Sequence, residues 1–185
     1  MSLTIITAPT VKPVALDQAK KHLRLDLDTD VDDWLITAMI AAATDQAEAR
    51  TNRSLITRTL RLRAYAAACI ELPRPPFANI SSVKLIDEDG AETVLTTDDY
   101  SVDTVPLVPV LELETLNDAK YVQVEYTAGY GSTAASVPES IRHWIMCRIN
   151  TMYEYREAFV AGTFDDKPGA FIDGLLGPYR IVSAH

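Results

Sequence analysis

Alternating aspartates form the pattern in this sequence that most resembles a metal site. Four of them occupy the first, third, fifth and seventh positions of a calcium-loop pattern: Asp26, Asp28, Asp30 and Asp32. The sixth position of such a loop requires glycine for a sharp turn and holds Val31 here. The twelfth requires a bidentate glutamate and holds Thr37. Two failures at the most constrained positions argue against calcium binding.

The same aspartates suit the beginning of a helix. Thr29 or Asp30 is expected to cap the backbone N–H groups of the first turn, and Asp32 and Asp33 favour the positive end of the helix dipole. We therefore interpret the acidic run as the start of a long helix that ends near Arg53.

Other chemistry-bearing residues are scattered. The histidines His22, His143 and His185 have no HxxxH or HExxH spacing, and Cys69 and Cys147 have no CxxC partner and are expected in the core. The glycine-containing stretch 127–132 follows a predicted strand and lacks the Lys-Ser/Thr of a P-loop, so it is interpreted as a turn. Scattered carboxylates leave a glycosidase-type pair open, with nothing in favour of it. We expect no enzyme, metal or cofactor.

Composition narrows the class of protein. The chain has 185 residues, of which 48% are hydrophobic, and a formal net charge of -9. The acidity disfavours a free-standing nucleic-acid binder and suits a soluble monomer, a partner of basic surfaces, or the wall of a channel through which DNA slides. No signal peptide or membrane-spanning run is evident, so synthesis in the cytoplasm and no membrane contact are expected.

The elements that would position these residues follow from hydrophobic period. Helical spacing predicts a helix near 16–25, the long helix to Arg53, and a third from about 137 to 157 that begins with proline and glutamate. Alternation predicts strands at 57–63, 69–72, 82–87, 92–96, 100–103, 110–113 and 121–126, with Asp89-Gly90 as a hairpin turn. The predicted fold class is α+β in one domain, 1–185. Its N- and C-terminal helices, at about 14–56 and 137–180, form a bundle with an inserted, mostly antiparallel small β-sheet at about 57–131.

Two groups of residues suit contacts between subunits. Ala38 and Ala42 belong to an alanine-rich stretch that lets another backbone approach closely, either within the subunit or between subunits. Arg58, Arg61 and Arg63 lie along one predicted strand, with Arg61 and Arg63 on the same face. Either a solvated face or a contact with an acidic partner explains them.

Several stretches, taken in order, resemble a known family. They are 13–25, the acidic link into the alanine-rich helix, 51–59, Leu72-Pro73-Arg74-Pro75-Pro76, 126–131, 137–142, 153–157 and Leu175-Leu176-Gly177-Pro178-Tyr179-Arg180. Together they are similar to the head–tail connector (adaptor, or head-completion) proteins of tailed phages, prophages and gene transfer agents. The resemblance covers nearly the whole chain. Ala15 departs from it, because a serine or threonine cap is usual there.

The resemblance implies a structural virion protein at the head–tail junction. Such a subunit forms a ring, commonly a dodecamer, with neighbouring copies. The ring docks beneath the portal protein, extends the DNA channel without specific DNA binding, and supports the next neck or tail protein. The family's C-terminal segment grips the portal, and the corresponding residues here are Phe171, Leu175, Leu176, Tyr179, Arg180 and Ile181. From the residues alone, this segment is as well suited to pack onto the helices of its own subunit as to bind the portal.

Two alternatives remain at this point. One is another neck or tail-completion protein, which would bind the tail tube in place of the portal. The other is a small α+β enzyme or ligand-binding protein, which a deep pocket with strongly perturbed carboxylates or histidines would favour.

Overall fold

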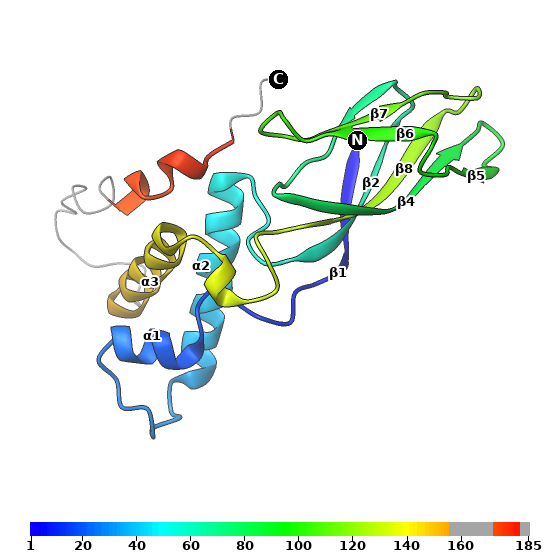
Figure 1. Ribbon diagram of the computed structural model, residues 1–185. Helices are drawn as coiled ribbons and strands as arrows, with labels where there is room; N and C mark the ends of the chain where they lie inside the picture. Colours follow the sequence, from blue (N-terminus) through cyan, green and yellow to red (C-terminus); the bar gives the residue numbers. More distant parts are fainter. Residues whose placement is uncertain (156–171, 182–185) are drawn as a thin grey trace. The chain divides into compact units, whose positions relative to one another are not determined.

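The computed structural model describes residues 1–155 and 172–181. The chain divides into two compact units, each made of two segments (Figure 1). The strand unit contains Met1–Thr10 and Ile56–Tyr130, and the helical unit contains Val11–Leu55 and Gly131–His185. Helices and two antiparallel sheets together confirm the α+β class.

Two sheets make up the strand unit. The five-stranded sheet has the order β1-β2-β8-β4-β5, and the three-stranded sheet has the order β3-β7-β6. Every pair of neighbouring strands is antiparallel. The strands are β1 (Ser2–Thr7), β2 (Arg58–Tyr65), β3 (Cys69–Glu71), β4 (Phe77–Ile86), β5 (Glu92–Val94), β6 (Tyr100–Asp103), β7 (Val110–Leu113) and β8 (Tyr121–Ala128).

Alternation along the strands builds a single core between the sheets. Leu60 and Leu62 of β2 are buried, whereas the alternate residues Arg61 and Arg63 lie on the opposite, outer face. Residues of both sheets meet in one hydrophobic cluster, which includes Ile70 and Leu111 of the smaller sheet. The two sheets therefore pack by their inner faces, and their outer faces remain available to solvent or partners.

Local chemistry fixes the turns of the strand unit. Gly129 ends β8 with a φ of +137°, and a Cβ there would lie 2.5 Å from the backbone nitrogen of Thr57. Its N–H donates to the carbonyl of Pro76 at 2.8 Å. The predicted Asp89-Gly90 turn joins the paired strands β4 and β5, as expected. The proline-rich stretch lies between β3 and β4, in a loop rather than within a strand.

Strand β1 is absent from the predicted elements. It pairs with β2 at the edge of the five-stranded sheet, and all of its residues except Leu3 are exposed. An edge strand without a buried face has no strict alternation, so its sequence carries little strand signal.

The helical unit contains α1 (Leu16–His22), α2 (Asp33–Thr51) and α3 (Glu139–Glu154), and these three helices contact one another. Short 3-10 turns lie at Ala134–Ser136 and Gly177–Tyr179. As predicted, α3 buries Ile141, Ile145 and Ile149 at helical spacing. Among the described residues, no helix is long and apolar enough to cross a membrane.

Helix starts differ from the sequence expectation. At α1, the Ala15 side chain offers no cap, and the Gln18 side chain accepts the Ala15 N–H at 3.2 Å. At α2, the expected cap by Thr29 or Asp30 is wrong. The helix begins only at Asp33, and its N-cap Asp32 makes no side-chain cap hydrogen bond, because its carboxylate accepts from the Tyr153 hydroxyl at 2.9 Å.

Candidate functional site

The C-terminal residues 172–181 pack against helices of their own unit. Leu176 and Ile181 are only 1% and 9% exposed. The Ile181 N–H donates to the Thr51 carbonyl at 3.1 Å, and Arg53 Nε donates to the Tyr179 carbonyl at 2.7 Å. The segment is therefore held by both backbone and side-chain hydrogen bonds at the end of α2.

Asp173 anchors this segment to two helices. Its carboxylate forms an ion pair with Arg50 of α2 at 2.5 Å and accepts a hydrogen bond from Trp144 Nε1 of α3 at 3.0 Å. The Arg50 guanidinium also lies over the Trp144 ring, 5.4 Å from its centroid. Burial raises the pKa of the Asp173 carboxyl, but the hydrogen bonds from Arg50 and Trp144 outweigh it and lower the pKa overall.

The predicted portal-binding residues thus fall into three groups. Phe171 lies outside the described residues. Leu176 and Ile181 are buried in the subunit, Leu175 and Tyr179 are half-buried, and Arg180 is exposed. Sequence reasoning did not identify the anchor of the segment, Asp173 with Arg50 and Trp144. A lone aspartate inside an apolar stretch was its only signal.

The alanine-rich helix α2 has two different apolar faces. Its buried face contains Ile36, Met39, Ile40, Ala43 and Ala47. The predicted interface residues Ala38 and Ala42 are exposed instead, on the side that also carries Trp34, which is 73% exposed. In the described part of the chain, the face with Ala38 and Ala42 is exposed, and its contact with another subunit stays a prediction.

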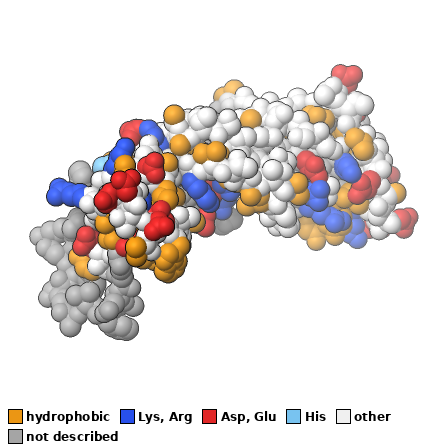
Figure 2. All heavy atoms as spheres, turned by 90° about the horizontal axis from the view of Figure 1, so that it is seen from below, with side chains coloured by type: hydrophobic (Ala, Val, Ile, Leu, Met, Phe, Trp, Pro, Cys, Tyr) orange, Lys and Arg blue, Asp and Glu red, His pale blue; other side chains and the backbone are white. Residues whose placement is uncertain are grey.

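The predicted arginine group divides between the two faces of β2. Arg61 and Arg63 lie on the outer face, whereas Arg58 has the same parity as the buried Leu60 and therefore lies on the other side of the sheet. Arg61 donates from both Nε and Nη2 to the Glu125 carboxylate on the neighbouring β8, at 2.8 and 2.6 Å. Figure 2 shows Lys, Arg, Asp and Glu side chains gathered among hydrophobic ones at the right of the view, where the strand unit lies.

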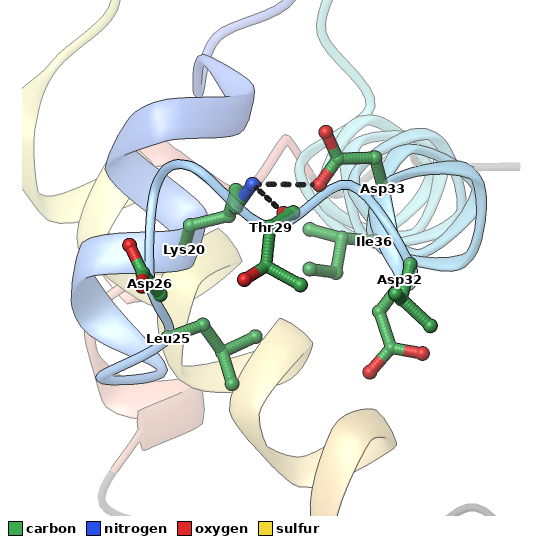
Figure 3. Close-up of a pocket in the computed structure, with 8 residues that line it drawn as sticks. Lys20, Leu25, Asp26, Thr29, Asp32, Asp33 and Ile36 are labelled. Carbon is green, nitrogen blue, oxygen red and sulfur yellow. Dashed lines mark hydrogen bonds and ion pairs between the residues drawn. The ribbon is translucent and has the colours of Figure 1, made fainter.

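The side chain of Lys20 on α1 reaches into the loop that contains the aspartate run. Lys20 is 3% exposed, and its ammonium lies 2.9 Å from the Asp33 carboxylate (Figure 3). The same Nζ donates to the carbonyls of Leu27 and Thr29. A pocket of about 170 Å³ lies beside it, lined by Lys20, Leu25, Asp26, Thr29, Val31, Asp32, Asp33 and Ile36. Lys20 therefore ties α1 to the acidic loop and to the start of α2.

Of the described thiols and histidines, Cys147 and His143 are in contact with each other. Cys69 was expected in the core and is exposed, because it flanks the buried Ile70 on β3. Cys147 lies one helical turn from His143, with 3.6 Å between Sγ and Nε2. Burial raises the pKa of the Cys147 thiol, the opposite of what an activated nucleophile requires. Among residues 1–155 and 172–181, no group of three His, Cys, Asp or Glu residues gathers to hold a metal ion.

The described residues form an α+β protein of two compact units. Comparison with known families sharpens this class. The sequence model of the phage gp6-like head-tail connector protein family matches residues 13–97. This match confirms the resemblance seen in the sequence, and together with the fold it supports a structural head–tail connector protein of a virion.

Solved structures with the same fold come from gene transfer agent particles. A chain of the neck of an empty GTA particle, computed with C6 symmetry, is 24% identical with a TM-score of 0.80. A chain of the virion of a native GTA particle is 23% identical with a TM-score of 0.81, and one of the native neck, computed with C12 symmetry, is 24% identical with a TM-score of 0.76. Each likeness covers 100% of this chain and 98% of the other. No curated protein matches the sequence.

Proposed function

We propose that this chain is a subunit of a connector ring that docks beneath the portal of a DNA-filled capsid, extends the DNA channel and carries the next neck or tail protein. The observation that carries the proposal is the connector family match over residues 13–97, on a chain whose whole length shares the fold of GTA neck and virion chains. The ring has neighbouring copies as its first partners, and a dodecamer is the number we propose. The C12 symmetry of one similar neck structure supports that number.

Within the ring, the N- and C-terminal helices act as the bundle that carries assembly contacts. The exposed apolar face of α2, with Ala38 and Ala42, is available for a neighbour. The net charge of -9 suits a channel wall, because repulsion keeps DNA from being trapped as it passes. The role is structural and requires no turnover and no cofactor.

The portal contact is assigned to the C-terminal segment, with a division of labour among its residues. Arg180, exposed, and the half-buried Leu175 and Tyr179 contact the portal directly from the packed state. Leu176 and Ile181 contribute only if the segment leaves Thr51 and the Asp173 anchor, because both side chains are now buried. A substitution at Arg180 therefore tests docking of the packed segment, and a substitution at Leu176 or Ile181 tests docking of the released segment.

The test uses the full chain and the portal protein encoded in the same genome. Mixed at saturating concentration and imaged by electron microscopy, the portal should gain a ring of added density on its tail-facing end. The variant Arg180→Glu should weaken the added density while leaving the fold intact, and Arg24→Glu, an exposed arginine of the α1–α2 connection, is the matched control. Unchanged portal particles at saturation would contradict the proposed function. Density on a tail tube and none on the portal would favour a tail-completion protein instead.

A further inference from the structure

Two exposed surfaces of the strand unit differ in chemistry and belong to different sheets. The first, the aromatic platform, consists of Arg63, Tyr65 and Tyr121 on the outer face of the five-stranded sheet. Tyr65 is 68% exposed and pairs with Tyr121 across β2 and β8, with ring centroids 5.2 Å apart. The Arg63 guanidinium lies 4.7 Å from the Tyr121 ring centroid.

The platform has the composition of an interaction centre. Tyrosine and arginine are among the residues enriched where binding energy concentrates, and the rigid rings of tyrosine lose little side-chain freedom on docking. On the same face, Arg61 and Lys84 are engaged in ion pairs with Glu125 and Glu92, whereas Arg63 is held by the ring of Tyr121. A partner carboxylate can therefore approach Arg63 without displacing one of those pairs.

The second surface is the loop 104–109, which closes the β6–β7 hairpin of the smaller sheet. Val105 and Leu107 are 92% and 60% exposed, so the tip is apolar. The chain around it is acidic: between Lys84 and Lys120 it carries aspartates and glutamates and contains no Lys or Arg. Asp103 stands at the base of the loop, opposite Val110, and the exposed Glu112 of β7 lies two residues further along, opposite Ser101.

Prolines and hydrogen bonds restrict the backbone of this apolar loop. Two of its residues are prolines, Pro106 and Pro109, which fix backbone angles. The Val105 N–H donates to the Asp103 carboxylate at 2.9 Å, and the Pro109 carbonyl accepts the Leu72 N–H at 2.8 Å. A preorganised loop that presents two aliphatic side chains to water suits a docking element, because little conformational entropy remains to be lost.

We propose that loop 104–109 of one copy docks on the aromatic platform of the next copy, with Val105 and Leu107 on the tyrosine rings and the acidic base of the loop toward Arg63. Charge complementarity selects a second copy as the occupant, since Asp103 at the base of the apolar loop and Arg63 on the aromatic platform carry opposite charges on the same chain. The two sheets pack by their inner faces, so one subunit can offer its platform to one neighbour and its loop to another. Contacts between unlike surfaces propagate head to tail and close into a ring when the rotation allows. The inference rests on the proposed ring function and adds the contact that orients each copy.

The test is a disulfide trap between copies of the full chain. Tyr65→Cys is made in one preparation and Val105→Cys in another, both with Cys69→Ser and Cys147→Ser. The preparations are mixed with portal protein from the same genome and oxidised. Ring formation is scored by electron microscopy and cross-linking by non-reducing electrophoresis. Both substituted sites are exposed, so folding is preserved.

A disulfide-linked dimer in the mixture, with at least about tenfold less in either preparation alone, is the expected result. Asp89→Cys in the exposed β4–β5 turn replaces Val105→Cys as the control and should give only background. Rings without the Tyr65–Val105 cross-link would overturn this inference and leave the ring function standing. Absence of both rings and cross-links would overturn the two together.

Discussion

The buried ammonium of Lys20 provides the sharpest test of how the acidic loop is held. Lys20→Met keeps most of the side-chain volume and removes the charge and all of its donors. The Asp33 carboxylate then loses its ion pair, and the carbonyls of Leu27 and Thr29 lose a hydrogen bond each. The loop between α1 and α2 would keep its acidic residues but lose the ammonium that binds two of its carbonyls.

The size of the effect follows from burial. Removing one partner of a buried ion pair costs about 3–5 kcal/mol. The Asp33 side chain is 31% exposed, so water offsets part of this cost, and we expect the free energy of unfolding to fall by about 2–3 kcal/mol. In a chain of this size that corresponds to a midpoint lowered by roughly 4–12 °C.

Tryptophan fluorescence isolates the unit concerned, because both tryptophans of the chain, Trp34 and Trp144, belong to the helical unit. Thermal and urea unfolding are followed by this signal for Lys20→Met and for Lys21→Met, an exposed neighbour on the same helix. Lys21→Met should change the unfolding free energy by less than about 0.5 kcal/mol. A loss below about 1 kcal/mol for Lys20→Met would refute the reasoning, since it would mean that the loop does not depend on the ammonium.

Three further predictions concern the other devices of the fold. Gly129→Ala should lower the unfolding free energy of the strand unit by about 1–3 kcal/mol, because its φ of +137° is strained for alanine and the Cβ would meet the Thr57 backbone. The measurement is a denaturant titration followed by circular dichroism. Gly90→Ala is the control for steric clash, because a Cβ there meets nothing within 4 Å. Tyr126→Phe should cost about 1 kcal/mol in the same titrations, since it removes the 2.6 Å hydrogen bond to the Pro73 carbonyl and leaves the buried ring in place. The lowered pKa of Asp173 means that its anchor stabilises the C-terminal segment above the ordinary value of 3.8 and is lost as pH falls below it through the folded-state pKa. Hydrogen exchange at the Ile181 amide, corrected for intrinsic rates, should accelerate in that window in the natural chain and not in Asp173→Asn; equal behaviour of the two proteins would contradict the assignment.

Elements with one buried face could be predicted from sequence, because burial imposes a period on them. The isoleucines at 141, 145 and 149 and the alternation of Leu60 with Arg61 both led to elements that the structure contains. Ser2–Thr7 could not be found this way, since almost none of it is buried. The partner of the alanine-rich stretch in α2 was ambiguous for the opposite reason: apolar residues on all sides give no single periodic face.

The sequence predicts which candidate site residues share a face, but it does not predict which residues they contact in the folded chain. That Arg61 and Arg63 share a face follows from strand parity alone. Several contacts that hold the C-terminal segment join residues more than a hundred positions apart, as in the hydrogen bond from Arg53 to Tyr179. Nothing in the sequence distinguishes Lys20 from a solvated helix residue, and only the folded loop shows its ammonium enclosed. Long-range pairing of this kind leaves no local pattern in the sequence.

The place of β8 in its sheet has a consequence for the order in which the chain folds during synthesis. It is the last of the strands in the described residues, yet it lies between β2 and β4 and pairs with both. Until 121–128 leave the ribosome, β2 and β4 each present an unpaired edge, and neither can close the core around Val122 and Val124. Such non-local closure is slow, and exposed edges in the meantime invite pairing with other nascent chains. A chain interrupted before Tyr121 should therefore aggregate, whereas completing those eight residues converts two open edges into the centre of a sheet.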